Sequence, residues 1–154
     1  MDTRTLALNF LAELWLGFTA KVDEDEELAN KILTVIKRAT RDRSTILKYS
    51  AFAYLFRLLE TFSEHRNVFA PIIYKTLTFS LVENYADPPL REYILVNFIT
   101  IFENDPAIPI SVVSDPLLKQ MAVAEEDGLS YNTFDFDFFI AMARNDKLKL
   151  KNAI

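Results

Sequence analysis

Apolar residues recur along most of the chain at spacings of three and four, the pattern of a helix with one buried face. Alternation with a period of two, bounded by Gly or Asn-Gly turns, is nearly absent. The pattern therefore predicts an all-α fold. The predicted helices span residues 3–20, 24–41, 44–64, 67–85, 88–103, 110–126 and 134–144.

Residues typical of helix ends stand at several of these boundaries. Asp23 precedes the acidic run 24–27, which complements the positive N-terminal end of a helix dipole. Asp87 is followed by two prolines, which predicts a capping residue with proline in the first turn. Asp105 precedes a proline and so marks the end of a helix. The acidic run lacks the central glycine and the spaced oxygen ligands of a calcium loop, so we interpret it as capping.

The predicted helices recur with a nearly constant period. Alternate helices begin at 3, 44, 88 and 134, and the intervening ones at 24, 67 and 110. A period in the low forties is typical of stacked helical hairpins. Shifting the chain against itself by 44 positions aligns apolar columns and one charged column: Leu8 with Phe52 and Val96, Phe10 with Tyr54 and Phe98, Leu33 with Leu77, and Lys31 with Lys75 and Lys119.

With this period the whole chain of 154 residues resembles the armadillo and HEAT-like α-solenoids. The runs Pro71-Ile72-Ile73 and Pro116-Leu117-Leu118 are similar to the proline-then-aliphatic start of second helices in such repeats. Gly-rich turns are missing, which favours a HEAT-like over a true armadillo repeat. The resemblance implies a single domain over 1–154, built as a right-handed stack of three hairpins (3–41, 44–85 and 88–126) and a last helix at 134–144.

Composition excludes several classes of site. The chain has no cysteine, two glycines far apart at 17 and 128, and His65 as its one histidine. Thiolate chemistry, zinc sites built on paired Cys or His, and glycine-rich phosphate loops therefore cannot form. We expect no cofactor, no metal and no enzymatic activity. A net charge of −5 and a sequence pI of about 4.9 argue against nucleic-acid binding.

The charged column is the first candidate binding surface. Equivalent positions in stacked hairpins form a line along one face, so Lys31, Lys75 and Lys119, with Arg38 and Arg41, would make a basic ladder. Such a ladder suits an acidic segment of a partner protein. The alternative is that these long side chains cover solvated surface without a partner.

Two apolar segments are further candidates. The first predicted helix, which contains Trp15, is apolar on most sides and must be covered by something. Either the chain is a fragment of a longer solenoid, or this helix contacts a partner or a second copy. The run 131–139 has four phenylalanines within six positions, among them Phe136. It is either a helix that closes the stack or an aromatic contact for a partner.

These observations favour a non-enzymatic protein–protein interaction or scaffold module in the cytoplasm. Cytoskeletal and ciliary assemblies are examples of the intracellular complexes that use such repeats. Two alternatives stay open. One is a regulatory helical subunit of an enzyme, and the other is a membrane-surface adaptor that uses the basic run 37–43.

Overall fold

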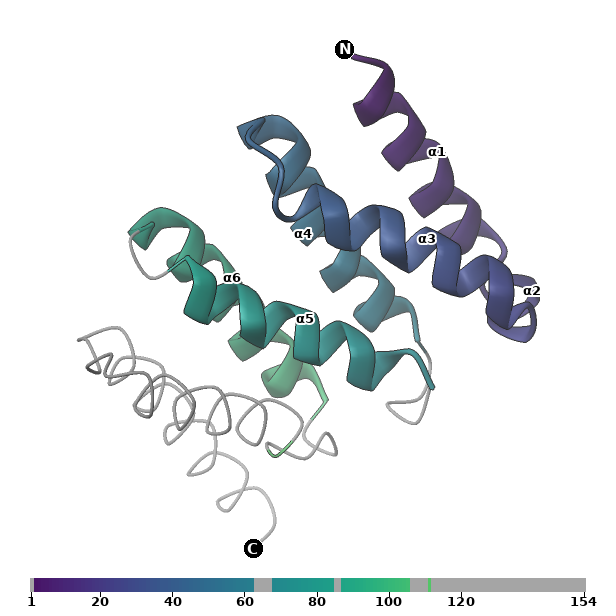
Figure 1. Cartoon of the computed structure of the whole chain (residues 1–154). Coiled ribbons are helices and arrows are strands. Elements are labelled where there is room, and N and C mark those ends of the chain that lie inside the picture. The colour runs from purple at the N-terminus through teal and green to yellow at the C-terminus, as the bar shows by residue number, and fades with distance from the viewer. Residues whose placement is uncertain (1, 63–67, 85–86, 106–110, 112–154) are drawn as a thin grey trace, which may run out of the picture. The chain divides into compact units, whose positions relative to one another are not determined.

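The computed structural model describes residues 2–62, 68–84, 87–105 and 111. Within them it contains helices and no strand (Figure 1), which confirms the all-α prediction. The helices are α1 (Thr3–Gly17), α2 (Thr19–Glu24), α3 (Glu26–Ala39), α4 (Thr45–Thr61), α5 (Ala70–Glu83) and α6 (Pro88–Asn104). The predicted helices at 110–126 and 134–144 lie outside the described residues.

The chain divides into two compact units, Met1–Ile73 and Tyr74–Ile154. In the first unit α1, α3 and α4 pack against one another in pairs, and the short α2 packs against α1 and α3. This packing encloses large side chains from all three long helices. The fully buried ones are Leu8, Trp15, Ile32, Ile36, Phe52, Leu55 and Leu58.

Side-chain caps begin α1, α4 and α6, and α3 has one as well. The carboxylate of Asp2 accepts a hydrogen bond from the backbone N–H of Thr5 at 2.8 Å, and its folded-state pKa is lowered chiefly by that bond. The Ser44 hydroxyl at the start of α4 accepts from the Leu47 N–H, and the Asp87 carboxylate at the start of α6 accepts from the Leu90 N–H. The predicted cap at Asp87, with prolines in the first turn, is confirmed.

The helix ends recur at nearly equal intervals. The helices α1, α4 and α6 end at 17, 61 and 104, intervals of 44 and 43 residues. The helices α3 and α5 end at 39 and 83, again 44 residues apart. Within the described residues, the ends of alternate helices are therefore 43 or 44 residues apart.

The buried positions refine the register between α4 and α6. Five side chains of α4 and their counterparts 43 residues later in α6 are all buried: Leu47 and Leu90, Ala51 and Ile94, Leu55 and Phe98, Leu58 and Ile101, Leu59 and Phe102. With the predicted interval of 44, Val96 should share the buried column of Leu8 and Phe52, but Val96 is exposed. The segment between α5 and α6 is one residue shorter than the segment between α3 and α4. The interval between equivalent buried positions is therefore 43 residues and not 44.

The predicted helix 3–20 is wrong at its C-terminal end. The backbone leaves the helical region at Phe18, which separates α1 from α2. The assignment of Asp23 as the cap of the following helix is also wrong. Asp25 fills that position, because its carboxylate accepts from the Leu28 N–H at 3.1 Å, whereas Asp23 accepts from the Trp15 indole.

The second unit is organised around an aromatic cluster. The ring of Tyr74, from α5, stacks with those of Phe98 and Phe102 from α6, with centroids 6.3 and 6.5 Å apart. Burial raises the pKa of the Tyr74 phenol to about 12, and the negative charge of Asp105 adds to the shift. This cluster fixes α5 against α6 through apolar contact.

Candidate protein-binding surface

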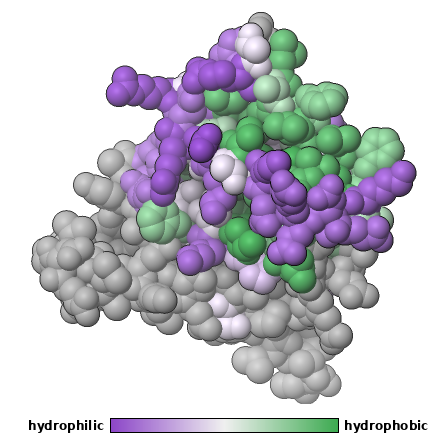
Figure 2. All heavy atoms as spheres, turned by 45° about the vertical axis from the view of Figure 1, so that its right-hand side comes forward, coloured by the Kyte–Doolittle hydropathy of each residue, from purple (hydrophilic) through white to green (hydrophobic). Residues whose placement is uncertain are grey.

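One side of α1 exposes large apolar side chains. Leu6 is 56%, Phe10 68% and Phe18 56% exposed, and Leu14, one turn after Phe10, is half-buried. Leu6, Phe10 and Leu14 are spaced four residues apart, so they lie along one side of the helix. We call Leu6 and Phe10, together with Phe18 directly after the helix, the outer side of α1. Figure 2 shows apolar side chains gathered where α1 lies, next to strongly hydrophilic ones.

The adjoining side of α1 contacts α4 through polar side chains. The Tyr54 hydroxyl donates to Asn9 Oδ1 at 2.9 Å, and Arg57 Nη1 lies 2.9 Å from Glu13 Oε1. Burial raises the pKa of Tyr54, and the charge of Glu13 raises it further. The Arg57 guanidinium also lies over the Tyr54 ring, 5.5 Å from its centroid. These contacts fix how α1 lies along α4.

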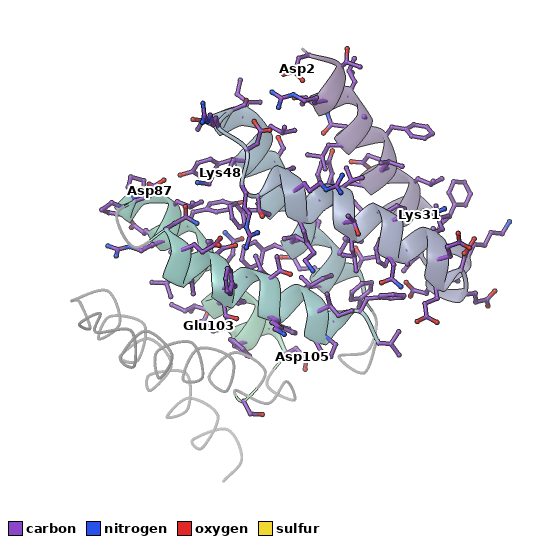
Figure 3. All side chains as sticks on the ribbon, in the orientation of Figure 1. Asp2, Lys31, Lys48, Asp87, Glu103 and Asp105 are labelled. Carbon is purple, nitrogen blue, oxygen red and sulfur yellow. The ribbon has the colours of Figure 1, made fainter. Side chains whose placement is uncertain are left out.

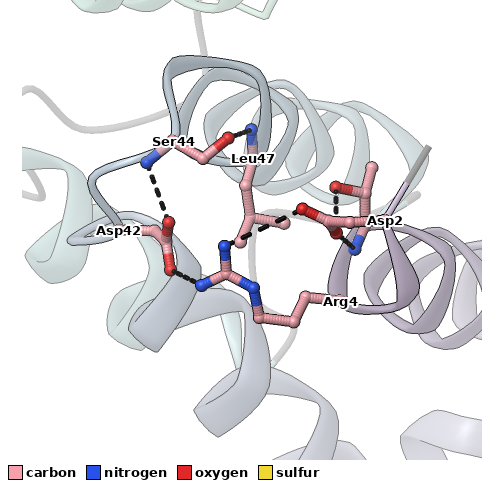
Figure 4. A network of polar contacts seen from close by, with 6 residues as sticks. Asp2, Arg4, Asp42, Ser44 and Leu47 are labelled. Carbon is pink, nitrogen blue, oxygen red and sulfur yellow. Dashed lines mark hydrogen bonds and ion pairs between the residues drawn. The ribbon is translucent and has the colours of Figure 1, made fainter.

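A second polar network joins the start of α1 to the turn between α3 and α4 (Figure 4). Arg4 Nη1 lies 2.6 Å from Asp42 Oδ2, and the other oxygen of Asp42 accepts from the backbone N–H of Ser44 at 2.8 Å. Asp42 is the last residue but one of the basic run 37–43. The carboxylate of Asp42, which pairs with Arg4 of the same chain, therefore interrupts the basic run.

Trp15, expected on an uncovered helix, has no exposed surface. Its ring meets that of Phe69 edge-on at 5.3 Å and lies 6.1 Å from that of Phe62, and its indole N–H donates to Asp23 Oδ1 at 2.9 Å. This expectation is therefore corrected, because the chain's own residues cover Trp15. The large apolar side chains of α1 that are exposed are Leu6 and Phe10, and Phe18, directly after the helix, is exposed too.

The spacing of residues along α1 could have separated these two sides. Trp15 follows Leu8 by seven residues and Ala12 by three, so the three share one helical face, and all three are buried. Leu6 and Phe10, four residues apart, lie on a different face from these three residues.

The structure describes four of the five residues of the predicted basic ladder. Lys31 is exposed and projects from α3 (Figure 3), where it forms an ion pair with Glu27 at 3.0 Å. Arg38, in the last turn of α3, and Arg41, just after it, are exposed, as is Lys75 of α5. Lys119 lies outside the described residues. Lys31 and Lys75 belong to different units, so their alignment stays a prediction.

Other candidate chemistry receives no support in the described part of the chain. It has no group of three or more His, Asp or Glu side chains placed to hold a metal ion. None of its helices combines the length and the apolar character that a bilayer span requires. Phe136 and His65 lie outside the described residues.

Comparisons with known proteins gave no match. No family model matches the chain, and no similar curated protein or solved structure was found. The interpretation of function therefore depends on the arrangement of the chain's own residues.

Proposed function

We propose that this chain is a non-enzymatic helical-repeat module that binds partner proteins in the cytoplasm. The recurrence of helix ends at intervals of 43 and 44 residues supports a HEAT-like stack of hairpins. In such a stack each hairpin contacts only its neighbours, so long faces stay available for partners. In the part of the chain that the structure describes, no group of side chains placed to hold a metal ion supports the enzyme alternative.

The single observation that carries this proposal is the outer side of α1. A helix already packed on α3 and α4 exposes Leu6 and Phe10, and Phe18 directly after it is also exposed. Soluble proteins rarely expose large apolar side chains next to one another unless something binds there. The membrane-surface alternative is less well supported, because the run 37–43 has four basic residues, near the minimum for binding an anionic membrane surface, and Asp42 lowers their net charge.

Affinity capture with the full chain tests the proposal. Wild-type protein and four variants are immobilised and exposed to a lysate of the source cells: Leu6→Asp, Phe10→Asp, the charge reversal of Lys31, Lys75 and Lys119 together, and Val96→Asp as control. Val96 is an exposed apolar residue of α6, 53% exposed, close to the value for Leu6. We expect that the wild type and the control retain the same proteins. The variants that alter one of the two surfaces should no longer retain them.

The outcomes separate the two candidate surfaces. Loss with the Leu6 and Phe10 variants assigns binding to the outer side of α1, whereas loss with the lysine variant assigns it to the ladder. Retention of the same proteins by the wild type and every variant would contradict both surfaces. Absence of any retained protein would contradict the proposed function itself.

A further inference from the structure

The end of α3 places three cations on one exposed side. Arg41 follows Lys37 by four residues and Arg38 by three, and all three side chains are exposed. The backbone keeps its helical course here, because Thr40 has helical dihedral angles and the Arg41 N–H donates to the Arg38 carbonyl oxygen at 3.1 Å. Residues at these spacings are neighbours on a helix surface, with Cβ atoms about 5–6 Å apart. We call Lys37, Arg38 and Arg41, together with the exposed Arg43 two residues later, the arginine cluster.

The turn that carries the arginine cluster is held in place by the rest of the first unit. Ala39 and Thr40 are buried, and the Asp42 N–H donates to the Ala39 carbonyl oxygen at 3.2 Å. Asp42 Oδ2 pairs with Arg4, and Asp42 Oδ1 accepts from the Ser44 N–H (Figure 4). Both oxygens of the one carboxylate in the run 37–43 therefore have partners already. A turn fixed in this way loses little conformational freedom when it binds a ligand.

The cations at the end of α3 are not balanced by their neighbours along the helix. Residues 33–35, three and four positions before Lys37 and Arg38, are uncharged. Within the described residues neither of these two side chains forms an ion pair, whereas Lys31, on the same helix, pairs with Glu27. The helix dipole favours cations at this end, but like charges at these spacings still repel one another. A bound anion would relieve that repulsion.

The composition of the arginine cluster favours phosphate as this anion. Three of its four cations are arginines, whose planar guanidinium can donate to two phosphate oxygens at once. A phosphorylated side chain carries a charge of about −1.5 to −2 and three acceptor oxygens, so one such group can pair with two neighbouring cations. Resting on the proposed function, we propose that the arginine cluster binds a phosphorylated segment of a partner protein.

Carboxylates of a second copy and an anionic membrane fit the arginine cluster less well. In the acidic run 23–27 of this chain, Asp23, Asp25 and Glu27 already accept hydrogen bonds or form an ion pair within the chain itself. An anionic membrane surface is expected to require at least as many basic residues as the four of the cluster. Both occupants are outcomes of the test.

Three labelled peptides that differ at two positions provide the test. The probe is a short peptide of alanine, glycine and glutamine with two successive phosphoserines, and the matched peptides carry two glutamates or two unmodified serines there. Binding to the full chain is measured by fluorescence anisotropy at about 0.15 M salt. The protein variants are Arg38→Ala, Arg41→Ala and Arg38→Lys/Arg41→Lys. The control Lys21→Ala removes an exposed cation of α2. Far-UV circular dichroism checks that each variant is folded.

We expect the phosphoserine peptide to bind the wild type at least about fivefold more tightly than the glutamate peptide, because its charge is larger and its oxygens suit the guanidinium. Arg38→Ala and Arg41→Ala should each weaken this binding by about fivefold or more. The double lysine variant keeps the charge and loses the planar donors, so binding should weaken by about threefold or more. Lys21→Ala should stay within about twofold of the wild type.

No binding of the phosphoserine peptide, or equal binding to the wild type and both alanine variants, would overturn the proposed site. Equal affinity for the glutamate peptide would overturn phosphate as the recognised group and assign the cluster to acidic segments, those of a second copy included. Unchanged affinity of the double lysine variant would overturn the role of the arginines. Sedimentation with phosphoinositide vesicles that both alanine variants lose, without peptide binding, would assign the cluster to a membrane instead. Failure of the peptide with successful capture from the lysate would refute this inference alone and leave the proposed function standing.

Discussion

The hydrogen bond between Trp15 and Asp23 links α1 to α2 across the break at Phe18. The indole N–H of a side chain with no exposed surface donates to Oδ1 of a half-buried carboxylate at 2.9 Å. Replacing Asp23 by Ala removes this acceptor and leaves the buried N–H without it. We therefore expect Asp23→Ala to destabilise the unit Met1–Ile73.

The magnitude follows from the burial of the two groups. A hydrogen bond to a charged group contributes about 1.5–3 kcal/mol, and a buried donor left without its acceptor costs about 1–3 kcal/mol. Because Asp23 is only half-buried, we expect Asp23→Ala to lower the free energy of unfolding by about 1–2 kcal/mol. In the Trp15→Phe background the donor is already absent, so the same change should cost much less. The coupling energy should be about 1–2 kcal/mol.

Urea unfolding of the wild type, both single variants and the double variant, followed by far-UV circular dichroism, measures this coupling. Trp15 is the chain's one tryptophan, so its fluorescence follows the first unit in the wild type and in Asp23→Ala. If Asp23 acted as a helix cap, its replacement would cost the same with Trp or Phe at position 15. A coupling energy below about 0.5 kcal/mol, the range of independent sites, would therefore refute the hydrogen bond as a stabilising contact.

Further predictions concern the caps, the buried tyrosine and the surface ion pair. Ser44→Ala and Asp87→Ala should each lower stability by about 1 kcal/mol in urea unfolding, because each removes a capping acceptor; a change below about 0.2 kcal/mol would contradict these caps. The folded-state pKa of Tyr74, about 12, exceeds the usual value of about 10, so the protein should lose stability as pH rises from about 10 to 12, by up to about 2–3 kcal/mol. In urea unfolding at these pH values, Tyr74→Phe should remove the part of the dependence that Tyr74 causes, and an unchanged dependence would contradict this assignment. Exchanging Arg57 for Met should change stability by less than about 1 kcal/mol, because its ion pair with Glu13 is half exposed; a larger loss would show that the pair does more than the geometry indicates.

Much of the helical architecture could be predicted from the sequence, because each boundary has a local cause. Asp87 and the prolines after it define the start of α6 without any tertiary contact. The break at Phe18 could not be predicted in this way, since apolar spacing continues through it. The break is accompanied by a hydrogen bond from the Trp15 indole to Asp23, which apolar spacing does not indicate. Asp25, two residues later, caps α3.

The candidate surface was predicted only in part. The apolar excess of the first helix correctly indicated that some of its apolar side chains are not covered within the described residues. Hydrophobicity alone could not tell which residues these are, because Trp15 and Phe10 are both large and aromatic. Their difference arises from the direction in which α3 and α4 pack on α1. The lysine column depends on contacts between hairpins, which no local signal determines.

The proposed stack of hairpins is tested most directly by the distance between Lys31 and Lys75. The chain has no cysteine, so Lys31→Cys/Lys75→Cys accepts spin labels at these two exposed positions alone. Helices packed side by side lie about 8–10 Å apart, so labels at equivalent positions of adjacent hairpins should interact strongly. We predict dipolar broadening of the low-temperature electron paramagnetic resonance spectrum of the double variant. A spectrum equal to the sum of the two single-label spectra would contradict the stack.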